Sequence, residues 1–135
     1  MRSLSRRVVA ELIGTALLVA AVIGSGIMAE KLSNGNIGLA LLGNTIATGA
    51  ALVALILTFG PISGAHFNPA VSVNGALVGG ISRREAILYV IAQCVGGLLG
   101  AAMAHAMFSA PLYSLSLHAR TGGAQIFWNS WPRLV

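Results

Sequence analysis

The stretch Ser63-Gly64-Ala65-His66-Phe67-Asn68-Pro69-Ala70 carries no charge and lies between two long apolar segments. Asn is a preferred N-cap residue, and Pro fits the first turn of a helix because its missing N–H would have no partner there. Residues 69–78 are mostly apolar or small, and Gly79 and Gly80 after them are typical of a helix end. The stretch therefore predicts a short helix over residues 69–78.

The composition is that of a membrane protein. Of the 135 residues, 56% are hydrophobic and 8% are charged, and the mean hydropathy is +0.85, whereas a soluble domain has about 25% charged residues. The net charge is +5, but the basic residues are few and scattered, which argues against a nucleic acid partner. The acidic residues are Glu11, Glu30 and Glu85 alone, too few for acid–base catalysis or a carboxylate metal site, so we predict neither an enzyme nor a cofactor.

Three segments reach the length of about 20 apolar residues that a helix needs to cross a bilayer, namely residues 8–28, 37–59 and 86–108. The first is longer than the apolar part of a signal peptide and contains Glu11, which argues against a cleaved leader. Because basic residues favour the cytoplasmic side, Arg6 and Arg7 predict a cytoplasmic N-terminus, and Arg83 and Arg84 return the chain to that side. We therefore predict an all-α, multi-pass protein of the lipid bilayer, with residues 109–135 as an extracytoplasmic tail.

The short helix cannot cross the membrane. At residues 69–78 it would be about 15 Å long, which is half the thickness of the hydrocarbon core. The segments before and after it both need their adjoining ends on the cytoplasmic side, so the half-helix enters and leaves on one side. Irregular backbone at membrane depth is tolerated where it is buried in protein or lines a watery cavity. We expect residues 63–67 to be extended and to offer their carbonyls to a pore.

Asn68 has two predicted roles at the start of the half-helix. Its side-chain oxygen caps the helix, while its NH₂ group donates into the pore. The half-helix also directs the positive end of its dipole at the membrane midplane, which disfavours cations, including protons. Together these features favour small neutral solutes that accept hydrogen bonds.

Three segments, AELIGTALLV (residues 10–19), SGAHFNPAVS (63–72) and AQCVGGLLGA (92–101), resemble the first half of the aquaporin and aquaglyceroporin family, the major intrinsic proteins. The resemblance implies two inverted repeats, each with three membrane helices and one half-helix, that enclose a single-file pore and assemble as tetramers. Residues 1–108 would be the first repeat. The resemblance also implies two groups of pore residues: the first signature, Asn68, Pro69 and Ala70, and the lining of the cytoplasmic half-pore, Gly64, Ala65 and His66.

Two polar residues, Glu11 and Gln93, lie within the apolar segments. Glu11 lies about one turn past Arg7, so it either extends to the lipid headgroups or accepts hydrogen bonds from N–H groups of the re-entrant loop, and the family pattern supports the second role. Gln93 is expected to support the loop in a similar way. His66 has neither an Asp nor a nucleophile in its pattern, which argues against catalysis, and the other His residues and Cys94 lack metal-site spacing.

Selectivity in this family involves a residue of the second helix about twenty positions before the NPA Asn. In this sequence that position is Thr48, where water channels of the family carry Phe and glycerol channels carry Trp. A small polar residue would widen the filter, so we expect passage of water and of small neutral solutes such as glycerol or arsenite. The segments GSGIMAEKL (24–32) and LILTFGPISGAHFNPAV (55–71) also resemble channels associated with bacterial arsenic resistance, which implies the cell inner membrane.

The family pattern requires a second repeat, so two functions remain open: half of a channel, or a truncated, non-conducting membrane fragment with at most an interaction role. The tail ends in IFWNSWPRLV (126–135). With one base inserted in the codon of Trp128 and permitted codon choices, the new frame encodes Ser-Glu-Phe-Val-Ala-Thr-Phe-Gly, in which the Glu and the Ala are forced. Its Glu-x-x-Ala-Thr corresponds to Glu11-Leu12-Ile13-Gly14-Thr15 of the first predicted membrane segment, with Ala in place of Gly14, as an internal repeat requires. We therefore predict a frameshift near residue 128, which sequencing of the DNA tests; a genuine half-length protein is the alternative.

Overall fold

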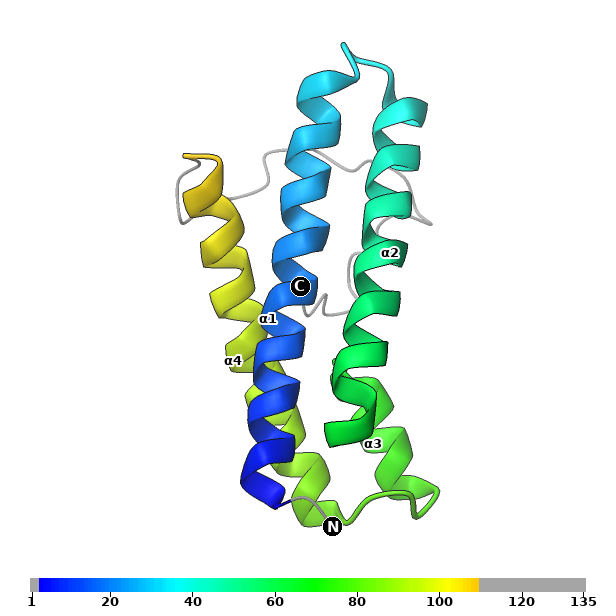
Figure 1. The fold of residues 1–135 in the computed structure, drawn as a ribbon, viewed down its shortest axis with the longest axis vertical. Coiled ribbons are helices and arrows are strands. Elements are labelled where there is room, and N and C mark those ends of the chain that lie inside the picture. The colour runs from blue at the N-terminus through cyan, green and yellow to red at the C-terminus, as the bar shows by residue number, and fades with distance from the viewer. Residues whose placement is uncertain (1–2, 110–135) are drawn as a thin grey trace, which may run out of the picture.

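The computed structural model describes residues 3–109, and within them the chain is all-helical. There are three long helices, α1 (Leu4–Leu32), α2 (Ile37–Ser63) and α4 (Arg83–Met107) (Figure 1). A short helix, α3 (Pro69–Leu77), lies between α2 and α4 in the chain. Each long helix is long and apolar enough to cross a membrane, with mean hydropathies of 2.2, 2.0 and 1.9 over its most apolar window. The predicted fold class is thereby confirmed, while the tail and its predicted frameshift lie outside the described residues, apart from Ser109.

The long helices extend beyond the predicted membrane segments. α1 begins at Leu4 and ends at Leu32, and α2 continues through Pro61 to Ser63. α4 begins at Arg83 because Ser82 caps it: Ser82 Oγ accepts from Glu85 N (3.2 Å), and Glu85 Oε2 accepts from Ser82 N (3.0 Å). Such a capping box satisfies two N–H groups that the first turn of a helix otherwise leaves without partners.

α1 packs against both α4 and α2 and lies between them in the view of Figure 1. The contact with α4 is close because a Cβ atom at Gly96 would overlap the carbonyl oxygen of Leu12, and one at Gly100 would overlap that of Ala16. Small residues at four-residue spacing allow this approach of two backbones in a membrane. α2 packs against α1 alone among the four helices, and its most apolar window has no buried residue.

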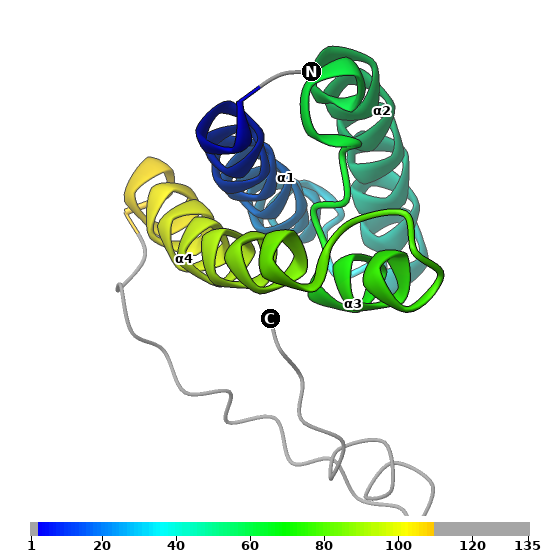
Figure 2. The same ribbon diagram turned by 90° about the horizontal axis from the view of Figure 1, so that it is seen from below.

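α3 is placed as a re-entrant half-helix. It has nine residues, so it is about 14 Å long, and it packs against α4. α2 ends, α4 begins and α1 begins at the same end of the bundle (Figure 1), and Figure 2 shows α3 beside the start of α4. The segment between α2 and α4 therefore enters the bundle from this end, and α3 returns to the same end without reaching the far one.

Candidate functional site

The loop between α2 and α3, residues 64–67, has a left-handed backbone at three positions: Gly64 (φ 92°), Ala65 (φ 50°) and Phe67 (φ 47°). The prediction that this stretch is extended was therefore wrong. For Ala65 and Phe67 this conformation costs on the order of 1–3 kcal/mol each. The loop adopts this conformation because it points successive backbone N–H groups into one concavity that can hold an anion.

The anion in this concavity is the side chain of Glu11, which is 0% exposed. Its Oε1 accepts hydrogen bonds from Ser63 Oγ (2.6 Å) and His66 N (3.0 Å). Its Oε2 accepts from Phe67 N (2.7 Å) and Gln93 Nε2 (2.8 Å). All four partners are donors, so the pattern is that of an ionised carboxylate, and Glu11 lies beneath the loop and not at the headgroups.

Gln93 connects this carboxylate to α3. Its Nε2 also donates to Ser72 Oγ (2.9 Å), and Ser72 Oγ lies 3.1 Å from His66 Nδ1. Gln93 is 2% exposed and Ser72 is 0% exposed, so this polar chain is inside the protein. The His66 ring is held further by an edge-to-face contact with Tyr89, with ring centroids 5.4 Å apart. His66, which the family resemblance predicts to line the pore, is thus held by contacts with α1, α3 and α4.

Asn68 is the N-cap of α3, and its Oδ1 accepts from Ala70 N at 2.8 Å. Pro69 follows in the first turn, as its missing N–H allows. The Asn68 side chain is exposed, and its NH₂ group has no hydrogen-bond partner within residues 3–109. It is therefore available to a solute at the start of the half-helix.

Phe67 fixes the loop from the apolar side. It is 6% exposed, and its ring lies edge-to-face on Phe59 of α2 with centroids 6.0 Å apart. A Cβ atom at Gly14 of α1 would overlap the ring of Phe67, so only glycine leaves room for it. The carboxylate of Glu11 and the space left by Gly14, about one turn later on α1, therefore hold the loop in place together.

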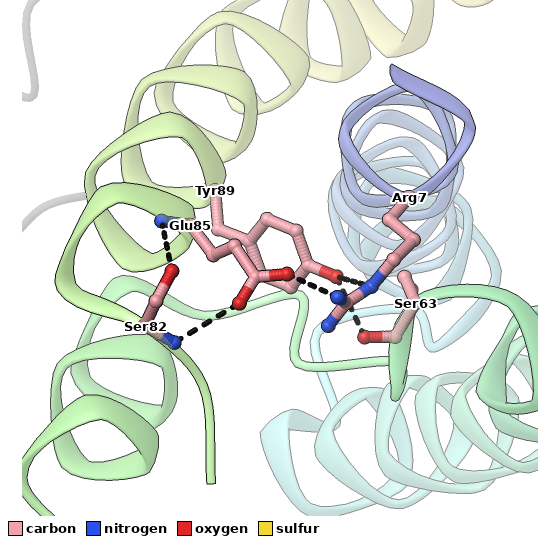
Figure 3. Close-up of polar contacts among 5 residues, drawn as sticks. All are labelled: Arg7, Ser63, Ser82, Glu85 and Tyr89. Carbon is pink, nitrogen blue, oxygen red and sulfur yellow. Dashed lines mark hydrogen bonds and ion pairs between the residues drawn. The ribbon is translucent and has the colours of Figure 1, made fainter. Parts of the chain in front are cut away.

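A second polar cluster holds the end of α2 at the end of the bundle where α1 begins (Figure 3). Arg7 Nε donates to Tyr89 OH (3.0 Å), and Tyr89 OH donates to the carbonyl oxygen of Ser63 (2.8 Å). The Arg7 guanidinium also forms an ion pair with Glu85, whose other oxygen belongs to the capping box with Ser82 (Figure 3). This cluster connects α1, the end of α2 and the start of α4.

Thr48 lies apart from the loop residues. Its Oγ1 donates to Asn44 Oδ1 at 3.3 Å, and Ser25 Oγ of α1 donates to the same oxygen at 2.8 Å. Along α2, Thr48 is 15 residues before Ser63, which is about 22 Å. The structure therefore places Thr48 beside the contact of α1 with α2, far from Glu11 and Gln93 along the bundle.

The sequence did not predict the contacts of several residues of the site, among them Arg7, Ser63, Ser72 and Tyr89. Ser63 and Ser72 could have been found, because they are the first and last residues of the quoted segment SGAHFNPAVS. Tyr89 had no local signal, since an aromatic residue in an apolar helix is ordinary. Within residues 3–109, no group of three or more His, Cys, Asp or Glu residues could hold a metal ion.

The chain is similar in sequence to known proteins along most of its length. The family model described as major intrinsic protein matches residues 1–130. The chain is 57% identical over 122 residues to the aquaglyceroporin AqpS of Rhizobium meliloti (strain 1021), a match that covers 90% of this chain and 52% of that protein. It is 39% identical over 105 residues to aquaporin Z of Photorhabdus laumondii subsp. laumondii, covering 77% of this chain and 44% of that protein. The chain thus spans about half the length of the curated relatives it matches.

Proposed function

The chain belongs to the major intrinsic protein family, and on that premise we propose that it forms half of a membrane channel for water and small neutral solutes such as glycerol or arsenite. The observation that supports this most is the re-entrant loop. Glu11 holds it inside the bundle and is itself bonded by Gln93, and Asn68 begins a half-helix directed back to the end it came from. A segment that only anchored the chain would need neither a strained loop nor a buried carboxylate.

The chemistry of the loop favours neutral solutes. Asn68 offers an NH₂ donor at the positive end of the α3 dipole, with Pro69 and Ala70 in the first turn behind it. Gly64, Ala65 and His66 would line the path beside this donor. A cation would lose hydration there and gain little, because the nearby carboxylate of Glu11 has all its acceptor positions occupied by the protein.

Thr48 is the proposed selectivity residue of this half. Its side chain is small, and its hydroxyl is already bonded to Asn44, so it would leave a wide and weakly polar opening. The relative from Rhizobium meliloti is called an aquaglyceroporin, which supports solutes larger than water. Arsenite, as a neutral polyhydroxide of glycerol size, is the second solute that this opening would pass.

The setting follows from charge and family. Arg6 and Arg7 of α1 lie at the same end of the bundle as Arg83 and Arg84 of α4, which supports a cytoplasmic location for that end. We propose a multi-pass protein of the inner membrane that assembles as a homo-tetramer, without catalytic activity and without a nucleic acid partner.

Osmotic swelling of proteoliposomes that contain this chain alone tests the proposal. Swelling in a glycerol gradient that exceeds that of empty liposomes is expected. If the helices insert but swelling equals that of empty liposomes, the chain is a non-conducting membrane fragment.

The variant Thr48→Phe tests the selectivity residue in the same assay. It should block glycerol or arsenite uptake and spare water, whereas the control Thr45→Phe, at an exposed position one turn away, should change neither. Fast water flow without glycerol uptake in the unmodified chain would contradict the wide opening.

A further inference from the structure

The direction of each hydrogen bond between Glu11 and His66 is determined by the bond before it. Both oxygens of Glu11 accept two hydrogen bonds, and two of the four donors are backbone N–H groups that cannot act as acceptors. Because Glu11 as an ionised carboxylate can only accept, the atom of Gln93 that faces Glu11 Oε2 is the amide nitrogen. Its two hydrogens then point to Glu11 Oε2 and to Ser72 Oγ.

The orientation of Gln93 determines the orientation of the Ser72 hydroxyl. Ser72 Oγ accepts from Gln93 Nε2 at 2.9 Å, so its own proton needs an acceptor. Within residues 3–109, the other polar atom in contact with it is His66 Nδ1, at 3.1 Å. A buried hydroxyl without an acceptor costs about 1–3 kcal/mol, so the proton lies on the bond to Nδ1. His66 Nδ1 is then an acceptor and carries no hydrogen.

The imidazole has little freedom to turn over. The ring packs closely on Gly75, where a Cβ atom would lie 3.0 Å from His66 Cε1, and Gly64 lies beside it on the Nε2 edge. Tyr89 contacts it edge-to-face. His66 is partly exposed, and Nε2 has no hydrogen-bond partner within residues 3–109. The Nε2 edge is thus the one that a solute can reach.

We infer that Ser72 is a positioning residue that holds neutral His66 as the Nε2–H tautomer, so that the ring presents a donor to the solute path. The inference rests on the proposed channel function only for the identity of the solute. A neutral imidazole has one donor and one acceptor nitrogen, and Ser72 occupies the acceptor. The exposed edge of His66 then binds hydroxyl or water oxygens as a donor, as the NH₂ group of Asn68 also does in the proposed function.

Solid-state ¹⁵N NMR of the full chain in lipid bilayers tests this inference without any transport measurement. The spectra are recorded at about pH 9, where imidazole rings are neutral. The His66 signals are identified by their loss in His66→Gln. The expected result is a protonated Nε2 and an unprotonated Nδ1 shifted by a hydrogen bond. A protonated Nδ1 in the unmodified chain would overturn the inference.

Two variants separate positioning from folding. In Ser72→Ala the Nδ1 signal should move to the position of an unbonded nitrogen, or a second tautomer should appear. Ser72→Thr keeps the hydroxyl and should restore the original spectrum. A Nδ1 signal that is the same in Ser72→Ala as in the unmodified chain overturns the inference. Absence of osmotic swelling, by contrast, would contradict the channel function and leave the tautomer assignment intact.

Discussion

Replacement of Glu11 by Gln tests whether the carboxylate holds the re-entrant loop. The substitution keeps the shape of the side chain but replaces one acceptor oxygen with an NH₂ donor. Because each oxygen of Glu11 accepts two hydrogen bonds, the new NH₂ group faces two donors whichever way the amide turns. One of each pair is a backbone N–H, of His66 or of Phe67, which cannot reorient.

The magnitude follows from the number of donors that lose their acceptor. One unpaired buried N–H costs about 1–3 kcal/mol, and the loss reaches about 2–6 kcal/mol if the neighbouring side chain cannot adjust. The lower range corresponds to an increase of about 5- to 150-fold in the population of the open loop. The effect should be local, because the packing of α1 on α4 by Gly96 and Gly100 does not involve this side chain.

Hydrogen–deuterium exchange of the loop peptide, measured by mass spectrometry in detergent or nanodiscs, gives the readout. The amides of His66 and Phe67 should exchange faster in Glu11→Gln by the factor above. Glu30→Gln is the matched control, since Glu30 lies on the same helix with an exposed side chain. If loop exchange in Glu11→Gln stays within twofold of the unmodified chain while α1 remains helical, the carboxylate does not hold the loop.

Three further predictions concern the rest of the bundle. Gly96→Val should force α1 and α4 apart and lower the free energy of unfolding by about 1–3 kcal/mol. Gly97→Val is the control and should not lower it, because a Cβ atom at Gly97 meets nothing within 4 Å. Equal shifts of the thermal unfolding temperature in detergent for the two variants would contradict this prediction. Tyr89→Phe keeps the ring but removes the donor to the last carbonyl of α2, so loop stability should fall by about 1 kcal/mol, and unchanged amide exchange would refute the role of the hydroxyl. Ser82→Cys, in a Cys94→Ala background, should react with an impermeant thiol reagent in inside-out vesicles, and reaction in intact cells would overturn the proposed orientation.

Much of the architecture could be predicted because it depends on neighbours along the chain. Long apolar runs give membrane helices wherever they occur, and Asn-Pro followed by small residues and Gly79-Gly80 begins and ends a short helix regardless of what surrounds it. The helix ends were less accessible, since the start of α4 depends on the reciprocal hydrogen bonds of Ser82 and Glu85.

The backbone of the loop could not be predicted from local rules. Ala65 and Phe67 are not residues that favour a left-handed conformation, and sequence reasoning accordingly assigned an extended strand-like path. They adopt it because their section of chain must direct its N–H groups at Glu11, which is more than 50 residues away in sequence. The hydrogen bonds that these N–H groups donate to the buried carboxylate offset the local strain.

The sequence by itself determined the membrane class, the three spanning helices and the position at which the half-helix begins, because hydropathy and capping act over a few residues. It left open whether Glu11 reaches the headgroups or the loop. Only the tertiary structure decided this, along with the contacts of Arg7 with Tyr89 and of Glu11 with Gln93, each of which joins residues 82 positions apart. Such contacts depend on the close packing of α1 on α4, and no rule confined to one segment contains that information.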